Sequence, residues 1–277
     1  MCGIFFIFMA LMKTKMRILS LIVILLITGS TVALSQPNDT INRFDKTGKR
    51  QGYWMKRYPN GHIQYEGYFK DDRPVKVFKR YYDNDTLQSI LFYSDDSRTA
   101  DAIFFHPNGF IAASGKYVNQ KKEGKWEFFS SAIKGYKITD EEYSNNMKNG
   151  LSVKYYPDKT VAEKIWYRDN VKDGEWIQYH ENGKIFLKAQ YVRGVLEGPF
   201  EVWDANGNLK YKGQYKNDRR EGIWYVYNPD GTVKNEIKYI NGMATNPELY
   251  KRENAILDSL EVTGKNLSDP EKTGTIW

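Results

Sequence analysis

The feature that most constrains the fold of this chain is an internal repeat of about 24 residues. The segment from Gly174 to Gly183, Gly-Glu-Trp-Ile-Gln-Tyr-His-Glu-Asn-Gly, has counterparts that begin at Gly198 and at Gly222. A repeat of this length indicates an architecture in which each unit contacts only its neighbours. More degenerate copies open at Gly52, Pro74, Ala100, Gly124 and Gly150, so that eight units fill residues 52–242.

Each unit has the pattern of a β-hairpin. An Asn-Gly or Asp-Gly pair, such as Asn182-Gly183, indicates a two-residue hairpin turn in which both residues have positive φ. After this turn apolar and polar residues alternate, which predicts a strand with one buried face. In this unit the expected inward set is Ile185, Leu187, Ala189 and Tyr191. On the first strand, Trp176 and Tyr179 fall on opposite faces unless a β-bulge intervenes.

These hairpins predict an all-β fold, namely an elongated single-layer antiparallel sheet of stacked hairpin repeats with a short C-terminal helix. Sixteen strands spaced about 4.8 Å apart would make a sheet on the order of 75 Å long. Such a sheet has no second layer, so large flat side chains have to cover one another along it. This requirement accounts for the 21 tyrosines, 14 phenylalanines and 7 tryptophans.

The C-terminal segment has the signals of a helix. Asn246, Pro247 and Glu248 place a proline in the first helical turn, where its missing N–H costs nothing. We expect this helix to cover the edge of the last strand. The alternative is a helix that binds a partner.

Residues 1–35 have the pattern of a secretory signal peptide. Lys13, Lys15 and Arg17 precede the apolar run 18–27, and small residues lead to a cleavage position near Ser35-Gln36. The apolar run is shorter than the roughly 20 residues of a transmembrane helix. We therefore predict an exported protein, located in the periplasm, in the cell envelope or outside the cell. The alternative is an uncleaved N-terminal anchor.

Four regions follow from these boundaries. They are the signal peptide (1–35), a lead-in segment (36–51), the repeat domain (52–242) and the C-terminal capping helix with its tail (243–277).

Charge and cysteine content narrow the range of functions. Removal of residues 1–35 lowers the formal net charge from +7 to +4, because three basic residues and no acidic ones leave with the segment. It also removes Cys2, the only cysteine, and with it any disulfide, thiol nucleophile or thiolate metal site. A charge this small on a chain of this length does not require a nucleic-acid partner.

The sequence offers little catalytic or metal-binding chemistry. His62, His106 and His180 are spread over separate units, and we interpret them as surface residues. The acidic run 140–142 is interpreted as a solvated turn. The basic pairs Lys121-Lys122 and Arg219-Arg220 are interpreted as solvated hairpin tips. We therefore expect no enzyme activity, no cofactor and no bound metal.

The remaining candidate is a surface. Aromatic residues recur on the first strand of the units and form a candidate interaction face for an extended partner: Trp54, Trp126, Trp176, Tyr179, Trp203, Trp224 and Tyr227. The alternative is that the tryptophans stack on one another as the core of the sheet itself.

The pattern Glu/Asp-Gly-x-Trp-x-x-Tyr-x-x-Asn-Gly, followed by an alternating strand that ends in Tyr-x-Asn-Gly, resembles the MORN repeat. It is most similar to the MORN repeat variant of bacterial proteins often described as antitoxin components of toxin–antitoxin systems. Residues 173–194, 197–217 and 221–242 carry the pattern best, whereas Pro74, Ala100 and the insert 131–135 depart from it. The resemblance implies elongated stacks of hairpins without catalytic activity of their own.

Three functions of different classes are consistent with these observations. The first is an exported, non-enzymatic scaffold that binds another protein through the face of its sheet. The second is association with a lipid surface, a glycan or the cell wall, which the mature charge of +4 mildly favours for anionic lipids. The third is an antitoxin role, which is implied by the resemblance alone.

Overall fold

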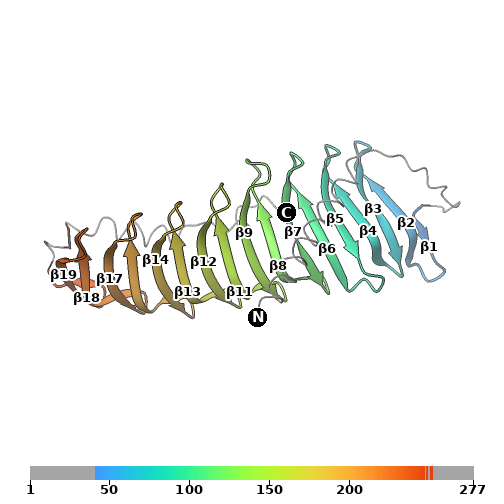
Figure 1. Ribbon diagram of the computed structural model, residues 1–277. Helices are drawn as coiled ribbons and strands as arrows, with labels where there is room; N and C mark the ends of the chain where they lie inside the picture. The colour runs from blue at the N-terminus through green and yellow to red at the C-terminus, as the bar shows by residue number, and fades with distance from the viewer. Residues whose placement is uncertain (1–40, 247, 249, 252–277) are drawn as a thin grey trace, which may run out of the picture. The chain divides into compact units, whose positions relative to one another are not determined.

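The computed structural model describes residues 41–246, 248, 250 and 251, and within them the protein is all-β. Twenty antiparallel strands form one open sheet, which confirms the predicted single layer of hairpins (Figure 1). The long strands are β2 (Arg50–Arg57), β3 (Ile63–Lys70), β4 (Arg73–Tyr81), β5 (Leu87–Tyr93), β6 (Thr99–Phe105), β7 (Ile111–Val118), β8 (Lys121–Phe129), β9 (Lys137–Ser144), β11 (Gly150–Tyr155), β12 (Val161–Arg168), β13 (Val171–Tyr179), β14 (Ile185–Val192), β16 (Gly198–Trp203), β17 (Leu209–Lys216), β18 (Arg219–Tyr227) and β19 (Val233–Ile240). Four strands have two residues each: β1 (Arg43–Phe44), β10 (Met147–Lys148), β15 (Val195–Leu196) and β20 (Met243–Ala244).

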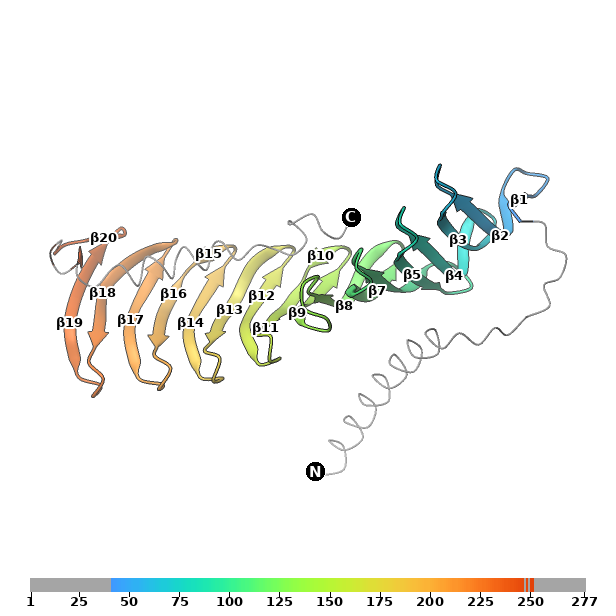
Figure 2. The ribbon, with the colours of Figure 1, turned by 90° about the horizontal axis from the view of Figure 1, so that it is seen from above.

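The long strands follow one another across the sheet in chain order (Figure 2). Each long strand is hydrogen-bonded to the long strand before it and to the one after it, including across the short strands, where β9 pairs with β11 and β14 pairs with β16. The predicted signal peptide and most of the predicted C-terminal helix lie outside the described residues.

The two kinds of turn in the sheet are arranged differently from the prediction. Within a unit, the N–H of Gly183 donates to the carbonyl of His180, and of the pair Asn182-Gly183 only the glycine has positive φ. This geometry is a type I turn closed by one left-handed residue, which an Asn-Gly pair also satisfies. Turns with positive φ at both central residues join consecutive units instead, at 71–72, 119–120, 145–146, 169–170, 193–194, 217–218 and 241–242.

A β-bulge follows the turn inside every unit. The register shifts between Gln178, which faces Leu187, and Tyr179, which faces Ile185, so that Phe186 is the extra residue. The other seven units have a shift at the same place. The expected inward set is therefore wrong at its first member, because the bulge leaves Ile185 exposed while Leu187 is fully buried.

One side of the sheet, the core face, carries the buried aromatic residues. Tryptophan or phenylalanine from one unit lies over a small residue of the unit before it. A Cβ added to Gly213 would lie 2.2 Å from Cδ2 of Trp224, and one added to Gly115 would lie equally close to Trp126. The indole N–H of Trp224 donates to the carbonyl of Gln214 at 3.2 Å. The core of this single layer is thus built from ring-over-glycine contacts between neighbouring units.

Basic side chains near the ends of strands pack over the aromatic rings of the core face. Nζ of Lys122 lies 5.1 Å from the ring centre of Trp126 and 4.8 Å from that of Tyr143, and the guanidinium of Arg220 lies 5.6 Å from the ring of Trp224. Cations over aromatic faces are attracted by the ring quadrupole. The interpretation of both basic pairs as solvated tips is therefore wrong for their second members, Lys122 and Arg220, which are buried.

Buried carboxylates also lie on the core face. Glu163 forms an ion pair with Lys154 at 3.0 Å and accepts hydrogen bonds from Gln178 and from the indole of Trp176. Burial raises the pKa of Glu163, but the charge of Lys154 and these hydrogen bonds lower it by more, so the pKa lies below its ordinary value. Glu141 pairs in the same way with Lys148 at 2.8 Å. The interpretation of residues 140–142 as a solvated turn is wrong, since Glu141 is buried within β9.

The two irregular units keep the strand order by different means. Lys76 stands opposite Tyr93 in the same register position in which Gly52 stands opposite Phe69. Lys76 has a φ of 59°, and the glycines at this position in other units also have positive φ. At Ala100 the ladder between β5 and β6 instead runs without a register shift.

Short segments protect both edges of the sheet. At the first edge, the side chain of Asn42 pairs with the backbone of Met55, to which it donates at 3.0 Å and from which it accepts at 2.8 Å. At the last edge, β20 pairs with β19. Glu248, Tyr250 and Lys251 are helical, and the ring of Tyr250 lies 6.4 Å from the ring of Tyr239 on β19. Covered edges limit pairing with other chains.

Candidate interaction surface

The side of the sheet opposite the core face is the outer face, and strand register defines its residues. One line of register partners crosses the sheet from β9 to β19 and is called the outer row: Asp140, Val153, Lys164, Ile177, Lys188, Glu201, Lys212, Tyr225 and Glu236. Partners in an antiparallel ladder point to the same side of the sheet. The outer row is therefore one continuous line of side chains across nine strands.

A second line, the aromatic row, lies two residues further along the first strand of each unit. It consists of half-buried rings at one repeat position: Tyr81, Phe105, Phe129, Tyr155, Tyr179, Trp203 and Tyr227. The structure thus divides the predicted interaction face. Tyr179, Trp203 and Tyr227 belong to the aromatic row, whereas the other predicted residues belong elsewhere.

Four of the predicted face residues are buried on the core face: Trp54, Trp126, Trp176 and Trp224. Their indoles are packed against rings of neighbouring strands, so they form the core of the sheet, as the alternative interpretation has it. Phe200 holds the equivalent core position in its unit, which explains why Trp203 lies on the outer face.

Sequence reasoning missed the most exposed tryptophan of the described chain. Trp166 on β12 is 45% exposed and stands opposite Leu151 on the outer face. Val171 and Met147 are also exposed. We call Trp166, Leu151, Val171 and Met147 the Trp166 patch. Leu151 is the register partner of Trp166, and Val171 is the partner of Arg168, two residues further along β12. The signal was present in the sequence, because Trp166 occupies a polar phase of the alternation between the inward residues Ile165 and Tyr167.

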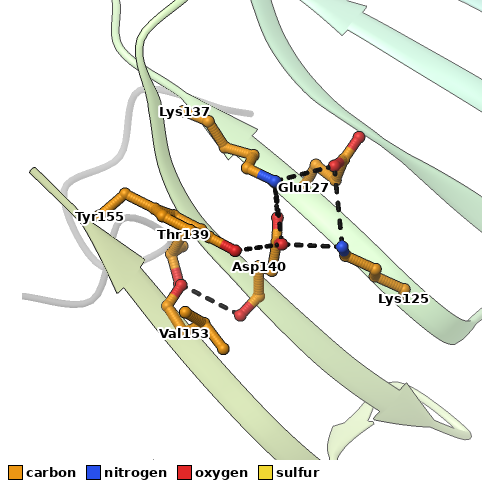
Figure 3. Close-up of polar contacts among 7 residues, drawn as sticks. All are labelled: Lys125, Glu127, Lys137, Thr139, Asp140, Val153 and Tyr155. Atoms are coloured by element: carbon orange, nitrogen blue, oxygen red, sulfur yellow. Dashed lines mark hydrogen bonds and ion pairs between the residues drawn. The ribbon is translucent and has the colours of Figure 1, made fainter. Parts of the chain in front are cut away.

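A cluster of charges on the outer face joins β8, β9 and β11 (Figure 3). The buried carboxylate of Asp140 pairs with Lys125 at 2.8 Å and with Lys137 at 2.9 Å, and it accepts the phenol hydrogen of Tyr155 at 2.8 Å. Lys137 also reaches Glu127 at 3.2 Å. The cluster is a closed ion-pair network, which again differs from the solvated turn expected at residues 140–142.

The pKa values in this cluster follow from its geometry. Burial lowers the pKa of Lys137, but Asp140 and Glu127 raise it by more, so the ammonium group is held in its charged form. Burial raises the pKa of Tyr155, and the hydrogen bond to Asp140 raises it further. Both groups therefore remain protonated at neutral pH and stabilise the Asp140 carboxylate.

The histidines connect turns of adjacent units. Nε2 of His106 lies 3.1 Å from the carbonyl of Phe129, and Nε2 of His180 lies 2.9 Å from that of Trp203. Tyrosine hydroxyls at the same repeat position, including that of Tyr156, donate to the equivalent carbonyls. The surface interpretation is wrong for His106, which is buried, while His62 contacts the carbonyl of Asp83 at an exposed turn.

Two further observations concern the described residues only. In that part of the chain, histidine, cysteine, aspartate and glutamate side chains do not gather in threes around a point that could hold a metal ion. None of its helical residues belongs to a helix long and apolar enough to cross a membrane.

Comparison with protein families identifies the repeat. The family model described as MORN repeat variant matches residues 50–71, 74–95, 172–193, 196–217 and 220–241. Five units of the chain are therefore similar to the MORN repeat variant. The match to 74–95 agrees with the geometry, which places Lys76 where the other matched units have glycine. Between the matched segments, the hairpins of residues 99–168 continue the same order of strands.

Comparison with solved structures yields a distant similarity. A structure described as the crystal structure of TcdB2-TccC3 is similar over 73% of this chain, with 10% sequence identity and a TM-score of 0.18. The chain spans 14% of the length of that protein. No curated protein sequence matches the chain.

Proposed function

We propose that this protein, five of whose units match the MORN repeat variant, is a non-enzymatic scaffold that binds another protein on the outer face of its sheet. The observation that carries the proposal is the Trp166 patch. An exposed tryptophan flanked by apolar side chains is typical of the centre of a protein interface, where tryptophan contributes more than most residues.

The surroundings of Trp166 support this role. A Cβ added to Gly174 would lie 2.8 Å from Cβ of Trp166, so this side chain lies directly against the backbone of the next strand. Packing of this kind limits the conformations that a side chain loses on binding. Beside the patch, the exposed side chain of Arg168 forms an ion pair with the largely buried Asp173 at 3.1 Å, which gives the apolar centre a polar rim.

The sheet also determines how a partner would be recognised. The backbone groups of β12 and β13 are used in ladders with their neighbours, so these strands do not offer an edge for strand addition. Recognition would therefore depend on side chains that project from the outer face. A partner that lies across several units would contact the same repeat positions in succession.

Export is part of the proposal and is supported by the sequence pattern of residues 1–35. N-terminal sequencing of the protein recovered from its native cells should give a chain that begins near Gln36. Recovery of an intact residue 1–35 segment in the cytoplasmic fraction would contradict export.

The binding proposal is tested by crosslinking in native cells followed by reconstitution with the purified partner. Trp166→Gln is the informative variant, because Gln190 and Gln214 hold the same repeat position in later units. Tyr68→Gln is the matched control, since Tyr68 is 39% exposed at that position in the first unit.

We expect a protein partner that crosslinks to the wild type and to Tyr68→Gln but is lost with Trp166→Gln. A protein that forms no partner complex, and instead sediments with anionic liposomes in a Trp166-dependent way, would replace the scaffold with the lipid-binding alternative.

A further inference from the structure

A regular array of lysines lies on the C-terminal half of the outer face. Lysine holds one repeat position on β12, β14 and β17, as Lys164, Lys188 and Lys212. One strand lies between each lysine and the next: β13 between the first two and β16 between the last two. Because neighbouring strands lie about 4.8 Å apart, successive lysines are spaced by about 9.6 Å. The face therefore repeats a lysine at a constant interval along the sheet, and Glu201 lies in the same row between Lys188 and Lys212.

Aromatic rings accompany these lysines at the same interval. Tyr179, Trp203 and Tyr227 of the aromatic row are half-buried, so each keeps part of its ring in contact with solvent. Nζ of Lys164 lies 5.6 Å from the ring centre of Tyr179. We call the six residues of both kinds the lysine–aromatic strip.

The lysines of the strip are available to a ligand. Lys188 pairs with Glu175 at 2.8 Å and Lys212 pairs with Glu201 at 3.0 Å, and about half of each lysine side chain is exposed. Exposed ion pairs of this kind contribute little to stability, so a ligand anion can take the place of the glutamate. Lys164 stands between Val153 and Ile177 in the outer row.

Two N-terminal units have the opposite charge at this position of the same face, whereas Ile90 and Ser114 hold it in the other two. Glu66 and Asp140 occupy the repeat position of the strip lysines, and they accept the phenol hydrogens of Tyr81 at 2.7 Å and of Tyr155 at 2.8 Å. In those units the aromatic row is engaged with carboxylates of the protein itself. The alternation of cation and ring is therefore a property of the C-terminal units.

We propose that the lysine–aromatic strip binds a linear polysaccharide that carries a carboxylate on alternate sugars. The flat rings would stack on the apolar faces of the sugars, and the lysines would pair with the carboxylates. The length of a disaccharide in an extended chain is close to the spacing of the strip. This site goes beyond the proposed protein scaffold, because it uses different residues of the outer face.

Charge density and backbone pairing favour this ligand over other linear polyanions. A nucleic-acid strand carries a phosphate about every 3.4 Å, which is nearly three times the density of the strip lysines. An extended acidic peptide is usually bound by strand addition at a sheet edge. The strip lies away from the edges of the sheet, where the backbone of β14 is already paired on both sides.

The test is titration of the full chain with hyaluronan, which carries a glucuronate on alternate sugars. Trp203→Ala should weaken binding about fivefold to tenfold, as expected for one lost stacking contact. Lys188→Gln should weaken it as well and reduce its dependence on salt. Phe129→Ala is the matched control at the same position of the aromatic row and should leave the affinity unchanged.

Trp203→Tyr shows whether a loss of affinity reflects the ring or the fold, because tyrosine holds this position in neighbouring units and should retain binding. Trp166→Gln should bind hyaluronan like the wild type, which separates this site from the scaffold proposal. Absence of hyaluronan binding would overturn the inference. Equal binding of neutral dextran or of polyglutamate, or equal effects of Trp203→Ala and Phe129→Ala, would overturn it too.

Discussion

Substitution of Gly213 by alanine tests the principle on which the core face is built. Gly213 does not have a left-handed φ, so alanine fits its backbone and only the added methyl group is tested. That methyl would lie 2.2 Å from Cδ2 and 2.3 Å from Cε2 of Trp224. The indole has no room to retreat, because the rings of Phe200, Tyr215 and Tyr239 lie 5.6, 5.3 and 5.9 Å away.

The size of the effect follows from two opposing contributions. Overpacking of a filled core costs about 1–3 kcal/mol. Replacement of glycine by alanine restricts the unfolded chain and returns about 0.4–1 kcal/mol. We therefore expect Gly213→Ala to lower the free energy of unfolding by at most about 2.6 kcal/mol, which corresponds to a fall in Tm of at most roughly 5–10 °C for a domain of this size.

A double-mutant cycle with Trp224→Phe isolates the contact. The chain itself pairs alanine with phenylalanine one unit earlier, where Ala189 and Phe200 hold the positions of Gly213 and Trp224. Urea denaturation of the wild type, both single variants and the double variant gives the coupling energy. Gly213→Ala should be nearly neutral in the Trp224→Phe background. If it costs as much there as in the wild type, or nothing in either, the ring-over-glycine account is refuted.

Three further predictions concern single positions. Lys76→Gly should raise the free energy of unfolding by about 0.5–1 kcal/mol in urea denaturation, because lysine is strained at a φ of 59°; no gain would contradict this. His180→Ala should lower the free energy of unfolding by about 1 kcal/mol and with it Tm, because the hydrogen bond to the Trp203 carbonyl is lost. His180→Tyr should restore Tm, because a tyrosine hydroxyl can donate to that carbonyl as Tyr156 does to the carbonyl of Tyr179. Equal Tm values for the two variants would argue against a stabilising bond between the turns. Folding lowers the pKa of Glu163, so the Glu163 carboxylate stabilises the protein at any pH above the ordinary glutamate pKa, and this stabilisation is lost when the pH falls through the folded-state pKa. The free energies of unfolding of the wild type and of Glu163→Gln, measured against pH, should therefore converge at low pH. Parallel curves would refute this.

The sheet could be predicted because the repeat period determines the strands, the turns and the contacts between neighbouring units. A unit of 24 residues contains two strands and two turns, so the same residues meet the same neighbours in each copy. The turn types could not be assigned from Asn182-Gly183 alone, because an Asn-Gly pair fits both geometries: it tolerates positive φ at both residues, and its glycine alone supplies the left-handed residue of the observed turn. The glycine role of Lys76 was hidden because lysine has no special preference for positive φ.

The outer face was harder to predict than the core. Trp176 and Tyr179 appear together in the repeat, but alternation along β13 sends them to opposite sides of the sheet. The amino-acid composition of the repeat does not say to which side of the sheet each ring points. Trp166 lies on the second strand of its unit, in a polar position of the alternation, whereas the predicted interaction face was drawn from the first strands alone. Strand register, which only the structure supplies, was needed to place these residues on one face or the other.

The bonds between turns have a mechanical consequence. Side chains at one repeat position tie five of the turns to the turn of the next unit, so these units are joined along the margin of the sheet as well as through their strands: Tyr58, Tyr82, His106, Tyr156 and His180. A force applied to the two ends of the repeat domain would load the outermost hairpin first and peel it from its neighbour. Each rupture would release about 24 residues, or roughly 80 Å of extended chain. Stretching would therefore extend the chain in steps of similar length, and the steps that break a tyrosine or histidine tie would need the larger force.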